Sequence, residues 1–494
     1  MRDSKRKDPS QIKYIICLVI GLFFMFVFGR IVPAWGSITP MGMNIIGIFI
    51  GMLFMTSTVG DLMFPGMFGM IALVSSGYMA ASEAAAGFLG SATVLQILLI
   101  LVLCNALSKT GVGEVIAKFI ITRRFIQGRP LLFVGMFLFA MFVGGIFIAT
   151  SSAVPFFFPI WDALCKQIGY KKEDSFNKLM LLGIYLFLVL GSFVIPFYGM
   201  VPMYVNYFTE QLSGTGFVFD PIAYMIPAIC VALAFLMLYV MAIKFVFRCD
   251  LDKLKDFDVS KMEGFDRDSI RANREQKIML TAFIAVIGYS LSIMFLPSSF
   301  PWYAAYKDFS LGFVTLLVLC ILGIYRVNGK SFLPLAQAFT QGVQWPIIIL
   351  LGSFSLVGGA LGNEELGITG FIIEMAGPVF GKLSWPLFIL VCVTLCTVLT
   401  NFISNMATAM MVFSIVTPFA VNFMKMGINV SVLGVAITYS CMFAYMTYSS
   451  FYCSAMLLGH EAIDSKFIFT KGLVPLLMYI VSAAILFTIF GYVF

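Results

Sequence analysis

Residues 386–413 read PLFILVCVTLCTVLTNFISNMATAMMVF, which is an apolar arm, a short polar cluster and a second apolar arm. The same construction occurs about 255 residues earlier, where residues 130–159 read PLLFVGMFLFAMFVGGIFIATSSAVPFFFP. Crossing a bilayer takes about 20 apolar residues, and the arms before the polar clusters fall short of a comfortable span. Non-helical backbone is tolerated at membrane depth only inside protein or beside a water-filled cavity. We therefore predict two re-entrant hairpins, at 130–162 and 385–422.

The composition is that of a polytopic membrane protein. Of the 494 residues, 61% are hydrophobic and 11% are charged, whereas soluble domains carry roughly 25% charged residues. The ten cysteines show no metal-ligand spacing, and the only histidine is His460, so we do not expect an enzyme. We interpret the net charge of +7 as a topology signal and predict no nucleic-acid partner.

We predict an all-α fold with eleven transmembrane helices beside the two hairpins. The predicted spans are 12–29, 40–57, 62–78, 90–108, 180–204, 221–244, 277–297, 308–325, 344–361, 431–456 and 472–493. With the N-terminus in the cytoplasm, 27 of the 31 Lys and Arg residues fall in inside loops, as the positive-inside rule requires. Eleven crossings of the cell membrane then leave the C-terminus on the outer side.

The two hairpins are predicted to enter the membrane from opposite sides. The spans that lead into them, 90–108 and 344–361, are five crossings apart, and an odd number of crossings inverts the orientation. This is an inverted-topology repeat. We divide the chain into N-terminal scaffold spans (1–89), a first repeat (90–244), a cytoplasmic linker (245–276) and a second repeat (277–494) that begins with scaffold spans at 277–325.

The span after each hairpin contains residues that disfavour a helix. In 180–204 Pro196 removes a helical hydrogen bond, and in 431–456 a Ser/Thr cluster runs from Thr447 to Ser450. We predict that both spans are broken in the middle of the membrane. Amphipathic stretches at 114–125 and 366–380 precede the hairpins and suit helices that lie in the interface plane.

Half-helices that end inside the membrane can hold ions with uncharged groups. Free amides at a helix N-terminus bind an anion, and unwound carbonyls with Ser, Thr and Asn oxygens bind Na+. The tips supply such side chains at Thr150, Ser151, Ser152, Thr400, Ser404, Asn405 and Thr408. Isolated hydroxyls in apolar segments usually join helices, but two clusters in matched positions favour an ion site. No acidic residue stands clearly in mid-span, which disfavours a proton antiporter.

The stretch from Thr400 to Ala409 resembles the second Ser-Asn-Thr hairpin of the divalent anion:sodium symporters, a family of the ion-transporter superfamily. The resemblance implies a homodimeric carrier with an elevator motion. It also implies that each hairpin and its broken span build one Na+ site, with the anion held between the tips. The implied Na+ ligands are Thr400, Ser404, Asn405, Thr150 and Gly191. The implied anion contacts are Thr150, Ser151, Ser152, Tyr198, Asn405, Met406, Thr408 and Ser449.

The chain departs from the family pattern at two places. The first tip reads Ala149-Thr150-Ser151 where the family has Ser-Asn-Thr, and Met406 replaces a threonine of the second tip. We predict Na+-coupled uptake of a small organic anion, for example a dicarboxylate, with no organic cofactor. The alternatives are Na+-independent anion exchange, a Na+/H+ or arsenite-type antiporter on the same scaffold and, outside the transporters, a channel.

Overall fold

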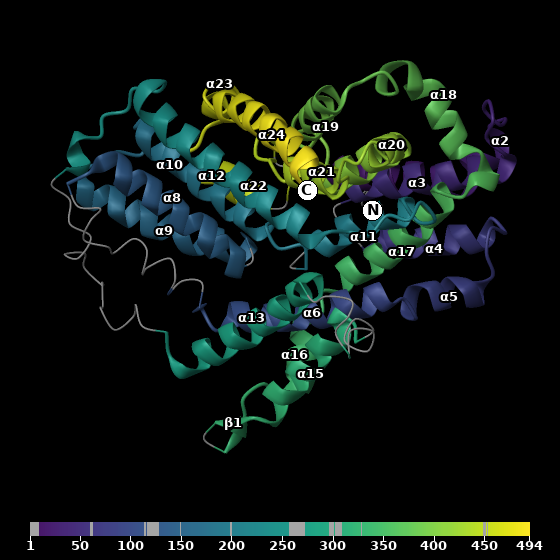
Figure 1. The fold of residues 1–494 in the computed structure, drawn as a ribbon. Helices are drawn as coiled ribbons and strands as arrows, with labels where there is room; N and C mark the ends of the chain where they lie inside the picture. Colours follow the sequence, from purple (N-terminus) through teal and green to yellow (C-terminus); the bar gives the residue numbers. More distant parts are fainter. Residues whose placement is uncertain are drawn as a thin grey trace, which may run out of the picture.

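The computed structural model describes residues 9–494 except 60–62, 113–114, 116–127, 149, 198–199, 256–271, 296–300, 302–308, 328, 448–450 and 452. The described chain is helical apart from one two-stranded hairpin (Figure 1). Most of the predicted amphipathic stretch at 114–125 lies outside the described residues.

The N-terminal part supplies helices that pack on one another before the first repeat begins. These are α1 (Pro9–Phe23), η1 (Phe24–Phe28), α2 (Gly29–Ile31), α3 (Pro40–Thr58), α4 (Met63–Ser75) and α5 (Ala81–Leu89). The first repeat contains α6 (Ala92–Lys109), α8 (Pro130–Phe147), α9 (Thr150–Ile168), α10 (Ser175–Ser192), α11 (Val201–Gln211) and α12 (Pro221–Phe245), and η3 (Asp252–Leu254) follows it.

The second repeat begins with its own scaffold helices and a small β-hairpin. These are α13 (Arg274–Phe295), α15 (Leu311–Ile324), β1 (Arg326–Val327), β2 (Lys330–Ser331), α16 (Leu335–Gly342) and α17 (Trp345–Leu361). The remaining elements are η6 (Glu364–Leu366), α18 (Ile368–Phe380), α19 (Trp385–Leu399), α20 (Asn405–Lys425), α21 (Ser431–Cys441), α22 (Ser454–Leu458), α23 (Ser465–Thr470) and α24 (Leu473–Val493).

The helices of the two hairpins pack on their neighbours in similar ways. Helix α8 of the first hairpin packs on α10 and α12, and α19 of the second hairpin packs on the corresponding α21 and α24. Helix α18 meets α19 at 107°, as expected for an interfacial helix that leads into a hairpin. Helices α5 and α16 were not predicted.

The helices that follow the two tips are longer than predicted, because α9 begins at Thr150 and α20 at Asn405, inside the polar clusters. Helices α8, α9, α19 and α20 contain 18, 19, 15 and 21 residues. By length and composition, the described residues contain seven helices able to cross a membrane, or nine if each bent pair is one span. Two of the seven are α8 and α20 of the predicted hairpins, so the expectation that their arms are too short to cross is wrong for these two helices. Helices α4 and α15, with 13 and 14 residues, fall short, so the count of eleven spans stays a prediction.

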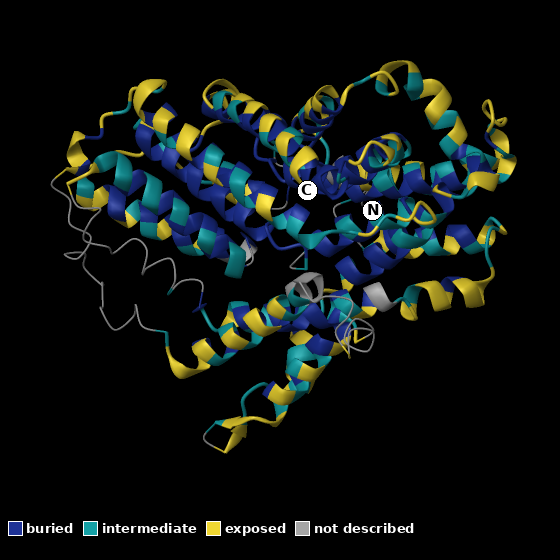
Figure 2. Ribbon diagram, viewed as in Figure 1, coloured by how far each residue is buried: buried dark blue, intermediate teal, exposed yellow. Residues whose placement is uncertain are grey.

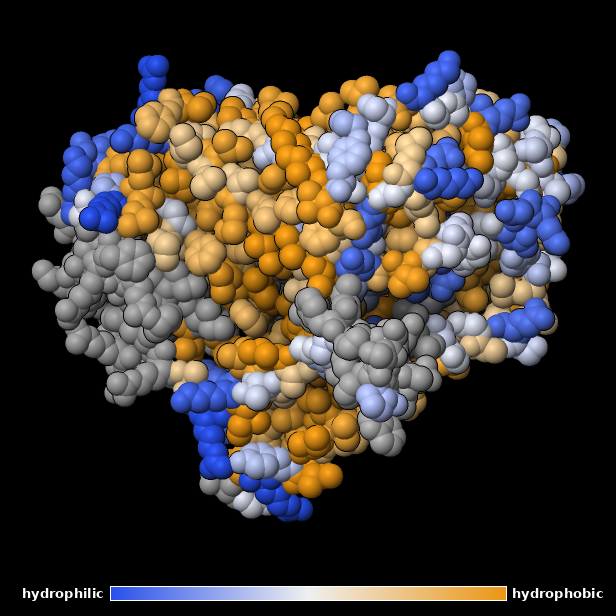
Figure 3. Space-filling view, viewed as in Figure 1, coloured by the Kyte–Doolittle hydropathy of each residue, from blue (hydrophilic) through white to orange (hydrophobic). Residues whose placement is uncertain are grey.

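Burial separates the outer helices from the centre. Helix α21 is buried along its whole length and α10 is buried from Leu179 to Ser192, as the dark blue of the centre shows (Figure 2). Helix α24, in contrast, exposes Leu473, Leu477, Val481, Ile485 and Ile489, which form an apolar stripe on the surface (Figure 3). A stripe repeating every four residues on a helix is the face expected against lipid.

Two glycines allow α8 and α10 to approach backbone to backbone. A methyl group on Gly191 would lie 2.0 Å from the carbonyl oxygen of Phe142, and one on Gly145 would lie 2.3 Å from that of Leu188. Small residues at a helix interface serve this purpose in membrane proteins. The position of Gly191 is therefore set by packing.

Replacing Gly191 with Ala should lower the free energy of unfolding by about 2–3 kcal/mol, because the clash is with backbone that no rotamer change can relieve. Gly135→Ala in α8 is the matched control, since its new methyl would meet only Val240, at 3.8 Å. Thermal melting in detergent measures both. If the two variants melt alike, the close approach of α8 and α10 is wrong.

Candidate functional site

The tip of the second hairpin is a tight turn that starts a long helix. Helix α19 ends at Leu399, and Ser404 begins α20 by accepting a hydrogen bond from the N–H of Ala407 at 3.2 Å. Serine is among the preferred residues at this position. The Asn405 side-chain oxygen accepts from the Met406 N–H at 2.8 Å, and the Thr408 hydroxyl donates to the Ser404 carbonyl at 3.1 Å. The N-terminus of a 21-residue helix thus lies at the tip.

Asn401 holds this tip against the interruption in the next span. Its side-chain oxygen accepts from the N–H groups of Tyr445 and Met446, both at 2.9 Å. Its side-chain amide donates to the carbonyls of Thr397 at 2.8 Å and Phe443 at 3.0 Å. Asn401 is fully buried, and its side chain makes all four of its hydrogen bonds to other groups of the protein.

Two further hydrogen bonds join the same elements. The Thr400 hydroxyl donates to the Cys441 carbonyl at 2.5 Å, and the Thr447 hydroxyl donates to the Asn401 carbonyl at 2.6 Å. Helix α21 ends at Cys441, and residues 442–447 are not helical. The second break therefore exists without a proline, because tip residues take over the hydrogen bonds that a continuing helix would have made.

The tip of the first hairpin lies against the end of α10. The oxygens of Thr150 and Ser192 are 2.8 Å apart, and Ser192 donates to the Leu188 carbonyl at 2.9 Å. Because the Ser192 hydroxyl donates its only proton to the Leu188 carbonyl, the Thr150 hydroxyl is the donor in the hydrogen bond between Thr150 and Ser192. Helix α10 ends at Ser192, and the chain resumes as α11 at Val201, on the far side of Pro196.

Two buried tyrosines join the breaks reciprocally. Tyr185 of α10 donates to the Ala444 carbonyl, just beyond the end of α21, at 2.7 Å. Tyr439 of α21 donates to the Leu190 carbonyl, at the end of α10, at 2.9 Å. Each tyrosine thus satisfies a carbonyl near the broken end of the other helix, and the two tips and two breaks form one connected centre.

This centre offers uncharged oxygens and amides. The sequence has no Lys, Arg, Asp or Glu between residues 130 and 161 or between 383 and 424. The hydroxyls of Thr397 on α19 and Thr438 on α21 are buried and make no hydrogen bond within the described part of the chain. Both lie about one turn from the second tip or break. Buried hydroxyls without a partner are costly, and a bound ion or water would satisfy them.

The predicted site residues differ in how far the structure describes them. Thr150, Thr400, Ser404, Asn405, Met406 and Thr408 lie at the two tips. The carbonyl of Gly191 accepts from the N–H of Val194 at 3.3 Å, at the end of α10. The side chains of Ser151 and Ser152, and all of Tyr198 and Ser449, lie outside the described residues.

Sequence reasoning missed the residues that hold the centre together. Asn401 stands in the quoted motif but received no role, although a buried asparagine beside a predicted break was a usable signal. Ser192, Tyr185 and Tyr439 gave no such signal, because each resembles an ordinary packing residue of an apolar helix.

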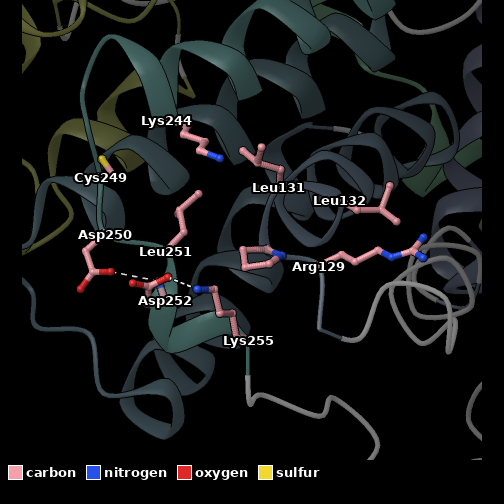
Figure 4. A pocket seen from close by; sticks show the side chains of 10 residues that line it. Arg129, Leu131, Leu132, Lys244, Cys249, Asp250, Leu251, Asp252 and Lys255 are labelled. Carbon is pink, nitrogen blue, oxygen red and sulfur yellow. Dashed lines mark hydrogen bonds and ion pairs between the residues drawn. The ribbon is translucent and has the colours of Figure 1, made fainter.

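A cavity of about 570 Å³ lies at the base of the first hairpin (Figure 4). It is lined by Arg129, Pro130, Leu131, Leu132, Lys244, Cys249, Asp250, Leu251, Asp252 and Lys255. Lys255 and Asp252 form an ion pair at 2.5 Å. Helix α8 separates this cavity from the tip by 18 residues, about 27 Å, so it is distinct from the candidate site.

Comparisons with known proteins place this fold among transporters. A family model described as citrate transporter matches residues 52–440. No curated protein sequence matches the chain. MtrF of Neisseria gonorrhoeae, whose structure is described as illuminating a class of antimetabolite efflux pumps, is 13% identical, with a TM-score of 0.57 over 99% of this chain and 96% of its own. The YdaH transporter of Alcanivorax borkumensis is 12% identical, with a TM-score of 0.54 over 84% and 88%. Both likenesses describe the fold.

Proposed function

The chain is a secondary transporter that belongs to the citrate transporter family, and from this premise we propose that it carries citrate or a related carboxylate anion together with Na+ into the cell. The membership agrees with the resemblance to the divalent anion:sodium symporters within the ion-transporter superfamily. The observation that carries the finer proposal is the hydrogen-bonded centre of two tips and two breaks, which offers hard oxygen ligands and two helix N-termini.

The second tip is the better Na+ site. Thr400, Ser404 and Asn405 supply side-chain oxygens, and the nearby break supplies carbonyls such as that of Cys441. Hard cations prefer such oxygen ligands. The Thr400 hydroxyl now donates to the Cys441 carbonyl, and turning both oxygens toward an ion is the rearrangement that Na+ binding would require.

The anion is proposed to bind between the tips. Helices α9 and α20 begin there, and the first N–H groups of a helix have no backbone partner within it. At α20 the side chains of Asn405 and Ser404 now accept from the N–H groups of Met406 and Ala407, so an anion would replace these two side-chain acceptors. A bound Na+ would add positive charge beside these amides, so each ligand should strengthen the binding of the other. Carboxylate recognition here needs no lysine or arginine.

An elevator motion is supported by the interface between the first break and the neighbouring helices. A small void there is lined by Ile195 and Phe197 of the break and by Ile100, Leu103, Phe283, Val286, Ile287 and Leu311 of α6, α13 and α15. An apolar contact of this kind has no directional bonds to break, so one domain can slide past the other at low cost. We further propose a homodimer, with the N-terminus in the cytoplasm and the C-terminus outside.

Thermal stability of the purified protein tests the proposal. Citrate, succinate, sulfate and acetate are each added in Na+ and in K+, and a ligand at a hundredfold excess over Kd should stabilise by about 2.7 kcal/mol. We expect citrate or succinate to stabilise more in Na+ than in K+. Equal stabilisation in both salts would favour Na+-independent exchange, which is the second candidate because the first tip, Ala149-Thr150-Ser151, has no asparagine. No stabilisation by any anion would contradict the proposed substrate class.

A further inference from the structure

The cavity at the base of the first hairpin, which we call the basal cavity, has three positive and two negative side chains among its described lining residues (Figure 4). Both carboxylates have partners nearby, since Asp252 pairs with Lys255 and Asp250 accepts from the N–H of Asp252 at 2.9 Å. Lys244 and Arg129 form no ion pair within the described part of the chain. Figure 4 shows that Arg129 extends away from the two lysines, so Lys244 is the unpaired cation that faces the cavity.

The basal cavity lies where α8 begins and α12 ends. A methyl group on Gly135 of α8 would meet Val240 of α12 at 3.8 Å, and each of these residues is five positions from the cavity end of its helix. Helix α12 is able to cross a membrane, and its 25 residues extend about 37 Å. This length exceeds a hydrocarbon core of about 30 Å but not a whole bilayer of about 40–45 Å. We therefore expect Lys244, one position before the end of α12, at the level of the lipid headgroups.

An exposed apolar stripe on α12 leads to the basal cavity. It consists of Leu233, Met237, Met241 and Phe245. The spacing of four residues puts these side chains on one face of the helix over about 18 Å, which covers the half-thickness of the hydrocarbon core, about 15 Å. Phe245 adjoins Lys244, whose ammonium lies 5.6 Å from the centre of the Phe245 ring. The apolar surface and the cation thus follow each other in the order of the acyl chain and the phosphate of a phospholipid.

The size and the lining of the basal cavity suit a lipid headgroup. Its volume of about 570 Å³ lies within the range of roughly 300–1,000 Å³ that is typical of small-molecule sites. Beside the charged residues it is lined by Pro130, Leu131, Leu132 and Leu251, which can pack against glycerol and ester carbons. The cavity therefore offers an apolar wall and a cation together.

The charges around the basal cavity favour an anionic lipid over the other occupants. A soluble anion would use Lys244 but would leave the stripe on α12 without a role. A lipid with a zwitterionic headgroup would cover the stripe but would bring its own cation into a surrounding that is already positive. Two further cations lie close by, the exposed Arg248 just after α12 and Lys471, whose ammonium is 5.8 Å from the centre of the Phe247 ring. Lysine and arginine at a membrane surface attract anionic lipids.

We propose that the basal cavity binds the headgroup of an anionic glycerophospholipid, with the phosphate at Lys244 and one acyl chain along the stripe on α12. The bound lipid contacts both α8 and α12, so it joins the base of the first hairpin to the neighbouring span. The site needs neither citrate nor Na+, and its test is therefore independent of the proposed substrate and cation.

Thermal melting of the full-length protein in a neutral detergent tests which ligand is bound. Phosphatidylglycerol, phosphatidylcholine and glycerol phosphate are titrated separately, and the rise in melting temperature gives an apparent affinity. We expect phosphatidylglycerol to bind at least about tenfold more tightly than phosphatidylcholine, and glycerol phosphate to have no effect at the same concentrations. Equal affinity for the two lipids would contradict recognition of charge. Stabilisation by glycerol phosphate equal to that by the lipid would show a site for soluble anions and overturn the proposal.

Variants of Lys244 test where the lipid binds. Lys244→Gln should weaken the apparent affinity for phosphatidylglycerol about fivefold, while Lys244→Arg should stay within about twofold of wild type. Lys330→Gln is the matched control, because it removes the same charge from an exposed position on β2, outside the cavity lining. Lys244 is exposed, so all three variants should melt like wild type without lipid. Wild-type affinity in Lys244→Gln, or an equal loss in Lys330→Gln, would overturn the proposed site.

Discussion

Replacing Asn401 with Ala is expected to lower the free energy of unfolding by about 3–5 kcal/mol and to abolish transport. The side chain makes four hydrogen bonds, two of them to N–H groups of the second break, and it is fully buried. Leaving a buried donor or acceptor without a partner costs about 1–3 kcal/mol. The variant leaves the N–H groups of Tyr445 and Met446 without their hydrogen-bond acceptor, because this segment is not helical and offers no other.

Asn206→Ala is the matched control for Asn401. Asn206 is also buried, but its side-chain amide makes one hydrogen bond, to Ser355 at 3.3 Å, among the described residues. Its loss should cost about 1 kcal/mol. Melting temperatures and denaturant midpoints of the two variants, measured in the same detergent, decide the matter. Similar losses in both would show that Asn401 does not organise the break.

Replacing Asn405 with Ala is expected to remove the stabilisation by Na+ while leaving a folded protein. Wild type should gain about 2.7 kcal/mol at a Na+ concentration a hundred times Kd. The variant should gain less than a quarter of that at the same concentration, because the alanine supplies no side-chain oxygen at the second tip. The Asn405 side chain accepts from the Met406 N–H at 2.8 Å and contacts the Met442 sulfur at 3.2 Å. Losing both should cost about 1–2 kcal/mol, which leaves the variant folded.

Ser414→Ala is the matched control for Asn405. Ser414 lies nine residues further along α20, where it bonds to Tyr207 and Gln211, far from the tip. Its response to Na+ should equal that of wild type. Melting in NaCl and in KCl at constant ionic strength separates a Na+ effect from a salt effect. Full retention of the Na+ response in Asn405→Ala would place the cation elsewhere.

The tips could be predicted from sequence because their signal is local. A cluster of Thr, Ser and Asn between apolar arms is unusual, and both helices after the tips begin at residues of the predicted clusters, Thr150 and Asn405. The first break carried its own signal in Pro196. Each of these features depends on neighbours in the chain, so composition and spacing suffice to find it.

The rest of the centre depends on contacts between distant residues. Asn401 creates the second break by bonding residues 44 and 45 positions away, and the Tyr185 hydroxyl reaches a carbonyl 259 positions away. His460 was an isolated histidine in the sequence, since its partner Asp162 is 298 positions distant. No periodicity marks such pairs. The sequence therefore predicted the polar tips and the first break but not the contacts that join them.

The most direct test of the central claim is a cryo-electron microscopy map of the protein in lipid nanodiscs with citrate and Na+. The account predicts ligand density between residues 150–152 and 404–408, at the middle of the bilayer. It also predicts that both ends of each hairpin lie on one side of the membrane, opposite for the two hairpins. Ligand density elsewhere, or a hairpin that crosses the bilayer from one face to the other, would contradict it.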